Sequence, residues 1–128
     1  MVKTILVVDD DEGYLLAASR LLESADYQVL TANSARAARR QLAAQVPDLI
    51  LLDVLMPAED GFTFAEKVSQ DARCADVPVV LVTAVAEHPG QILYAFEKGK
   101  GCTVAGVLQK SQAHERLLDT VEQALSEQ

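Results

Sequence analysis

Five residues with chemically useful side chains each follow a short apolar run of the sequence. They are, in chain order, Asp9, Asp10, Asp53, Thr83 and Lys110. Asp53 comes directly after the run Leu-Ile-Leu-Leu at residues 49–52. An unpaired buried carboxylate costs several kcal/mol, so an acid at the end of a core strand indicates a function. Each of the five has an ordinary structural explanation by itself, but their common position at strand ends favours a shared site.

The residue types predict phosphoryl chemistry. Three carboxylates in one pocket repel one another unless a cation compensates, and oxygen-only ligands in a small acidic cleft suit Mg²⁺ or Mn²⁺. We therefore predict a metal site at Asp9, Asp10 and Asp53. The Lys110 ammonium and the Thr83 hydroxyl would complete a cradle for a transferring phosphoryl group. Asp53 would then be the nucleophile and form an acyl phosphate.

Five strands and five helices are predicted to position these residues. The apolar runs at 4–8, 28–30, 49–52, 77–82 and 104–108 are typical of strands. The amphipathic stretches between them predict helices. These are a helix with an apolar face at Leu15, Ala18, Leu21, Leu22 and Ala25; a helix at 34–45 with Ser34 as its N-cap; a helix after Asp60 and Gly61 marked by Phe64, Ala65 and Val68; and helices at 89–99 and 112–126.

This alternation predicts an α/β fold with a five-stranded parallel sheet and helices on both faces, because parallel strands need crossover connections. The expected strand order is 2-1-3-4-5, as in flavodoxin-like folds. A length of 128 residues predicts a single domain over 1–128. In such sheets the working site lies beyond the carboxyl ends of the strands, where all five side chains fall.

Composition excludes several classes of protein. The formal net charge of −8 argues against direct nucleic-acid binding. No apolar run is long enough for a signal peptide or a membrane span. Cys74 and Cys102 lack metal-ligand spacing and are expected to be free thiols in a reducing cytoplasm, and His88 and His114 are isolated. We expect a cytoplasmic protein that binds other proteins.

The order and spacing of four motifs resemble the receiver domain of two-component response regulators, from about residue 3 to about residue 126. The motifs are LVVDD at 6–10, LLDVLMPAEDG at 51–61, LVTA at 81–84 and the lysine of VLQK at 107–110. The resemblance implies that Asp53 accepts a phosphoryl group from a phosphohistidine on a sensor histidine kinase or phosphotransfer domain. Such a domain is a regulator and not an enzyme, although it assists its own phosphorylation and dephosphorylation.

The resemblance also implies a ligand set and an output surface. Asp9 and Asp10 would hold Mg²⁺ together with the backbone carbonyl of Leu55, and Thr83 and Lys110 would contact the phosphoryl oxygens. A downstream protein would bind around the fourth helix, fifth strand and fifth helix, and a phosphorylation-linked homodimer stays open. Asp11 and Glu12 are read as acids of the first helical turn.

Four features depart from the family pattern. Ser111 replaces the usual proline after the lysine, which predicts either a trans bond with a shifted Lys110 or a strained cis bond. Val107 replaces the usual aromatic switch residue, and the spacing from Thr83 to Lys110 is longer than usual. Leu55 and Val85 are apolar where they would flank the phosphoryl group. From these two residues we predict a long-lived acyl phosphate.

Three other classes of protein share parts of this pattern. A flavodoxin needs phosphate donors in its first loop, whereas DDDEG at 9–13 is acidic. A dehalogenase-like phosphatase needs a second acid two residues after its nucleophile, where this chain has Leu55. The remaining alternative is a receiver-like interaction module that works without phosphorylation. The complete site weighs against that module, and the departures in the switch region favour it.

Overall fold

The computed structural model describes residues 2–53, 64, 67–68, 70–83, 104–110 and 113–126. The elements are β1 (Thr4–Val8), α1 (Glu12–Ser24), β2 (Gln28–Ala32), α2 (Ala35–Ala44), β3 (Leu49–Asp53), β4 (Val79–Thr83), β5 (Val104–Gln109) and α5 (Ala113–Ser126). Phe64, Lys67, Val68 and Gln70 are helical, as expected for the third helix. The helix predicted at 89–99, like Cys102 and His88, lies outside the described residues.

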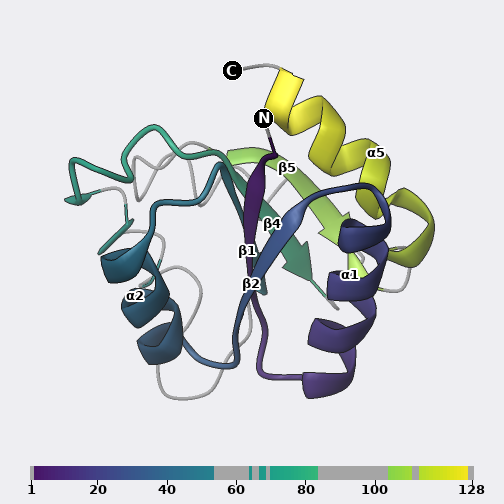
Figure 1. Ribbon diagram of the computed structural model, residues 1–128, viewed down its shortest axis with the longest axis horizontal. Helices are drawn as coiled ribbons and strands as arrows, with labels where there is room; N and C mark the ends of the chain where they lie inside the picture. Colours follow the sequence, from purple (N-terminus) through teal and green to yellow (C-terminus); the bar gives the residue numbers. More distant parts are fainter. Residues whose placement is uncertain are drawn as a thin grey trace.

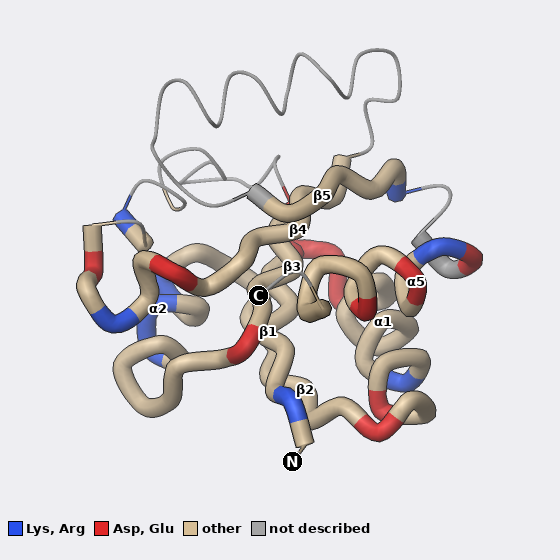
Figure 2. Tube along the Cα trace, turned by 90° about the horizontal axis from the view of Figure 1, so that it is seen from above, with Lys and Arg blue, Asp and Glu red and all other residues tan. Residues whose placement is uncertain are grey.

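The five strands form one parallel sheet in the order β2-β1-β3-β4-β5, which confirms the predicted topology. Helices α1 and α5 lie on one side of this sheet and α2 lies on the other (Figure 1). The view from above in Figure 2 shows the same division. The molecule is therefore a three-layer α/β structure, as the alternating elements predicted.

Two apolar clusters hold the layers together because successive strand residues point to opposite faces. Leu6 and Leu52 belong to the cluster that includes Ala38 of α2. Ile5 and Leu51 belong to the other cluster, which α1 and α5 cover. All residues of β1, β3 and β4 are buried. Strand β2 lies at an edge of the sheet, and its first four residues are exposed or only partly buried.

The helix ends follow local capping chemistry. Ser34 is the N-cap of α2, as predicted, and its hydroxyl accepts a hydrogen bond from the Ala37 N–H at 3.0 Å. Asp11 is the N-cap of α1 and not a first-turn residue, whereas Glu12 does lie in the first turn. Ala25 is the exposed C-cap of α1, so its assignment to the apolar face was wrong.

The start of β4 also differs from its prediction. The strand begins at Val79 and not at Val77. The N–H of Val77 donates to the carbonyl of Cys74 in a turn at 3.0 Å, and Pro78 has no N–H for a sheet ladder. Cys74 is a free, buried thiol whose pKa is raised by burial.

Candidate phosphoryl-acceptor site

The carboxyl ends of β1 and β3 bring three acids together. One carboxylate oxygen from each of Asp9, Asp10 and Asp53 lies within 4.8 Å of the other two. Asp9 and Asp53 are buried, at 1% and 5% exposure, while Asp10 is exposed. The set consists of oxygen donors only, with two buried carboxylates and one open to solvent. These residues fit a hard divalent cation such as Mg²⁺, which binds through few carboxylates and keeps several waters.

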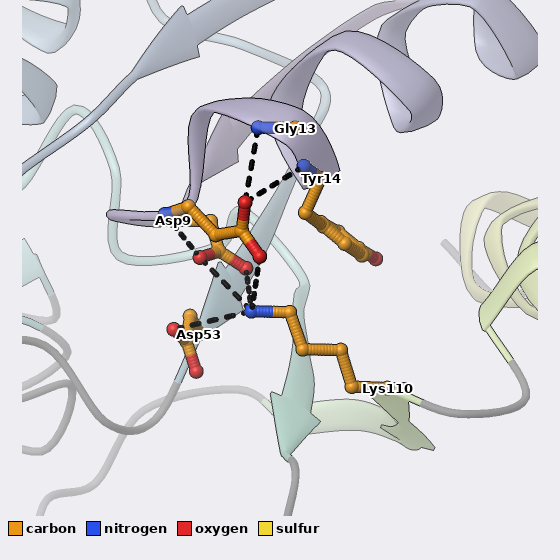
Figure 3. A network of polar contacts seen from close by, with 6 residues as sticks. Asp9, Gly13, Tyr14, Asp53 and Lys110 are labelled. Carbon is orange, nitrogen blue, oxygen red and sulfur yellow. Dashed lines mark hydrogen bonds and ion pairs between the residues drawn. The ribbon is translucent and has the colours of Figure 1, made fainter.

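Lys110 follows β5 directly and extends its ammonium group into these acids (Figure 3). Its Nζ lies 2.9 Å from Asp9 Oδ2 and 3.1 Å from Asp9 Oδ1. The distances to Asp53 Oδ2 and Asp11 Oδ2 are both 3.9 Å. Burial alone would lower the pKa of Lys110, but the hydrogen bond to Asp9 and the charges of the three acids raise it overall. Lys110 is therefore charged at neutral pH.

The loop from β1 to α1 holds Asp9 in place. The backbone N–H of Asp11 donates to Asp9 Oδ1 at 2.9 Å, and the N–H of Asp9 donates to the Ala32 carbonyl at 3.1 Å. The Asp11 carboxylate in turn accepts from the N–H groups of Gly13 and Tyr14 at the start of α1. The same cap that starts the helix therefore orients the acidic pocket.

Tyr14 is a site residue that the sequence reasoning missed. Lys110 Nζ lies 5.0 Å from the centroid of its ring, within the range of a cation–π interaction. The hydroxyl is buried and has no hydrogen-bond partner among the residues that the structure describes. Burial, with the charges of Asp9 and Asp53, raises the pKa of Tyr14 well above its ordinary value. Its spacing of four before Ala18 is the signal that would have placed it on the inner side of α1.

Of the remaining predicted residues, the structure describes Thr83 and Val107. Thr83 is the last residue of β4 and is 1% exposed, so the structure places it at the same sheet edge as Asp53. Val107 pairs with Leu81 and packs against the cluster on the α2 side of the sheet. The predictions for Leu55, Val85, Ser111 and the longer segment after Thr83 fall outside the described residues.

The chain belongs to the response regulator receiver domain family, whose pattern matches residues 5–122. Receiver domains of this family are signalling modules of two-component systems. The part of the chain that the structure describes contains no helix long and apolar enough to cross a membrane.

Relatives and solved structures agree with this membership. Response regulator PleD of Caulobacter vibrioides is 40% identical over 95 residues, which are 74% of this chain and 21% of PleD. Protein PilH of Pseudomonas aeruginosa is 28% identical over 95% of this chain and 97% of its own length. The structure of chemotaxis protein CheY4 of Vibrio cholerae matches with a TM-score of 0.86 at 28% identity, covering 97% of this chain and 99% of CheY4. The chain spans only about a fifth to a half of the first curated relatives.

Proposed function

We propose that this chain is the phospho-acceptor of a two-component system and that Asp53 receives the phosphoryl group. The observation that carries the proposal is the grouping of the Asp53, Asp9 and Asp10 carboxylates within 4.8 Å beside the Lys110 ammonium. A buried carboxylate on a rigid strand is a positioned nucleophile. Its partner would be a phosphohistidine of a sensor kinase or phosphotransfer domain.

The reaction is a phosphoryl transfer from a phosphohistidine donor to the Asp53 acceptor. A carboxylate oxygen of Asp53 forms a bond to phosphorus while the phosphorus–nitrogen bond of the phosphohistidine breaks, and the imidazole leaves and takes up a proton. Asp9, Asp10, Asp53 and the carbonyl of Leu55 would hold Mg²⁺, or Mn²⁺. When bound, this ion neutralises charge that develops on the phosphoryl oxygens.

Lys110 and Thr83 would support the phosphoryl group from the β4 and β5 side. The Lys110 ammonium already lies 3.9 Å from Asp53 and would donate to a phosphoryl oxygen. The Thr83 hydroxyl, at the end of the neighbouring strand, would donate to a second one. We propose these roles because Thr83 and Lys110 lie at the carboxyl ends of β4 and β5, at the same edge of the sheet as Asp53.

Further proposals about the domain, its location and its output rest on membership of the receiver family. We propose a single domain over residues 1–128, a cytoplasmic location, and signal output by protein contacts around the fourth helix, β5 and α5. A phosphorylation-linked homodimer is part of the same proposal. The apolar Leu55 and Val85 give a further expectation, an acyl phosphate that persists well beyond seconds.

A second candidate is a receiver-like module that binds its partner without phosphorylation. Val107 favours it, because a partly buried valine packed against the core cannot swing as a large aromatic switch could. In that case the fold and the acidic site would remain while no phosphoryl group is accepted.

The deciding experiment is incubation with Mg²⁺ and a small acyl or amido phosphate donor, followed by intact mass measurement. We expect one added phosphoryl group in the wild-type chain and none in Asp53→Asn or without metal. Asp76→Asn, which changes an exposed aspartate away from the site, is the matched control and should behave like the wild type. Absence of any mass increase in a chain that binds Mg²⁺ would instead support the phosphorylation-independent module.

A further inference from the structure

Helix α2 has a charge pattern opposite to that of the whole chain. It carries Arg36, Arg39 and Arg40 and no acidic residue, although the chain has 19 acids and a net charge of −8. Lys67 and Arg73 lie beside it, so this region holds five of the chain's 11 basic residues. All five side chains are exposed. In Figure 2 several of the blue segments lie around α2.

This pattern does not stabilise the helix itself. Arg36 lies in the first turn of α2, where the helix dipole favours acidic residues. Arg36 and Arg40 are four residues apart, a spacing at which like charges repel. The arginines therefore need an explanation outside the helix.

A pocket of about 230 Å³ opens between α2 and the segment around residues 67–74. Its apolar lining comes from Leu42, Val68 and Cys74, which are buried core residues. Its charged lining consists of three basic residues and one acid, namely Arg39, Lys67, Arg73 and Asp71. The pocket thus combines an apolar floor with a net positive edge.

Arg73 fixes one side of this pocket. Its guanidinium donates to the Leu42 carbonyl at 3.1 Å and to Asp71 Oδ2 at 3.5 Å. The Arg73 backbone N–H also donates to Asp71, and mainly for this reason the pKa of Asp71 is lowered. Asp71 is therefore charged and engaged with Arg73, and Arg39 and Lys67 add two further basic residues to the described lining.

We propose that this α2 pocket binds an acidic segment of a partner protein, with an aliphatic side chain inserted against Leu42, Val68 and Cys74. Charge complementarity argues for this occupant, since acidic residues on the segment would face Arg39 and Lys67. A nucleic acid fits poorly, because its phosphates extend beyond the pocket and would meet a surface that is acidic overall. Helix α2 lies across the sheet from α1 and α5 (Figure 1), so the pocket that it lines is separate from those helices.

The test is selection of short random peptides on the immobilised full chain, followed by affinity measurement on synthesised peptides. The pocket variant is Arg39→Glu with Lys67→Glu. The control is Lys3→Glu with Arg20→Glu, exposed positions in the N-terminal segment and on α1 that change the net charge by the same amount. Circular dichroism checks the fold of both. If the pocket variant does not fold, Arg39→Ala and Lys67→Ala replace it singly.

We expect selected peptides to be rich in Asp and Glu around one Leu, Ile or Met. The pocket variant should bind them about tenfold or more weakly, and the control variant within about twofold of wild type. Failure to select acidic peptides, or equal loss in both variants, would overturn the proposal. So would tight binding of duplex DNA or anionic vesicles that depends on Arg39 and Lys67, since either would assign the pocket to another ligand class. None of these outcomes depends on phosphorylation of Asp53.

Discussion

Lys110 Nζ lies 2.9 Å from Asp9 Oδ2 but 3.9 Å from Asp53 Oδ2. The lysine is therefore paired most closely with a residue of the proposed metal site and not with the proposed acceptor. Asp9 is only 1% exposed. A metal ion bound at the proposed site would therefore compete with the Lys110 ammonium for this buried carboxylate. Entry of a metal ion at Asp9 would weaken this pairing and make Lys110 available to the phosphoryl oxygens.

Replacement of Lys110 by alanine should destabilise the metal-free chain and increase its response to Mg²⁺. The change leaves the buried Asp9 carboxylate without its ammonium partner, which costs about 1–3 kcal/mol. Because the competing ammonium is gone, Mg²⁺ should bind more tightly and recover part of this loss. Thermal unfolding with and without Mg²⁺ measures both effects.

Lys3→Ala, at an exposed position in the N-terminal segment, is the control for loss of one positive charge. It should change neither the stability nor the response to Mg²⁺ by a comparable amount. If the increase in melting temperature on adding Mg²⁺ is the same in Lys110→Ala and wild type, the competition for Asp9 does not exist.

Tyr14 should act on Lys110 through its ring and not through its hydroxyl. Tyr14→Phe keeps the ring 5.0 Å from Lys110 Nζ and removes a buried hydroxyl that has no partner in the described part of the chain. We expect it to be as stable as wild type or more so. Tyr14→Leu loses the cation–π interaction, worth about 0.5–2 kcal/mol. Denaturant unfolding ranks the variants, and the Lys110 ammonium resonance should shift in Tyr14→Leu only.

The raised pKa of Tyr14 predicts a specific loss of stability at high pH. In the unfolded chain the phenol ionises near its usual pKa of about 10. In the folded chain burial and the acidic neighbours keep it protonated to higher pH. Its contribution is therefore fully present below pH 10 and is lost as the pH rises towards the folded pKa. Tyr14→Phe should unfold at a higher pH than wild type, and equal alkaline midpoints would contradict this assignment.

The sequence predicted the sheet better than the arrangement within the site. Apolar runs such as residues 49–52 indicate strands buried on both faces, and a parallel sheet places the carboxyl ends of its strands at one edge. The common position at the carboxyl ends of the strands was enough to predict that Asp9, Asp53 and Thr83 lie near one another. The half-exposed state of β2 was missed, although Gln28 and Thr31 make this strand more polar than β3.

The pairing within the site depends on geometry that the sequence does not contain. Which carboxylate Lys110 meets depends on sheet twist and on the register shift between β4 and β5 near Val79 and Val80. The role of Tyr14 was missed because the apolar face of α1 was counted from Leu15 onward. A helical wheel begun one residue earlier would have included it.

Arg36→Glu should stabilise the chain if α2 carries its arginines for a partner and not for its own helix. The substitution places an acid in the first turn and replaces a repulsive Arg36–Arg40 pair with an attractive one. We expect a gain of about 0.5–1.5 kcal/mol at low salt, smaller at high salt. Arg36→Gln, which only removes the charge, should gain less. Urea unfolding at two salt concentrations measures the order, and a loss of stability in Arg36→Glu would show that Arg36 supports the fold.

Asp26 follows the C-cap of α1 with φ of 70°, in the left-handed region where glycine is favoured. Its carboxylate also lies near the negative end of the helix dipole. Asp26→Gly relieves both penalties but adds freedom to the unfolded chain, so the net gain should be about 0.5–1 kcal/mol. Asp26→Asn removes only the charge and should gain less, while Asp26→Val should lose stability because a β-branched residue is strained there. Thermal unfolding of the three variants measures their stability, which should decrease in the order Gly, Asn, wild type, Val. A Val variant more stable than wild type would rule out this backbone conformation.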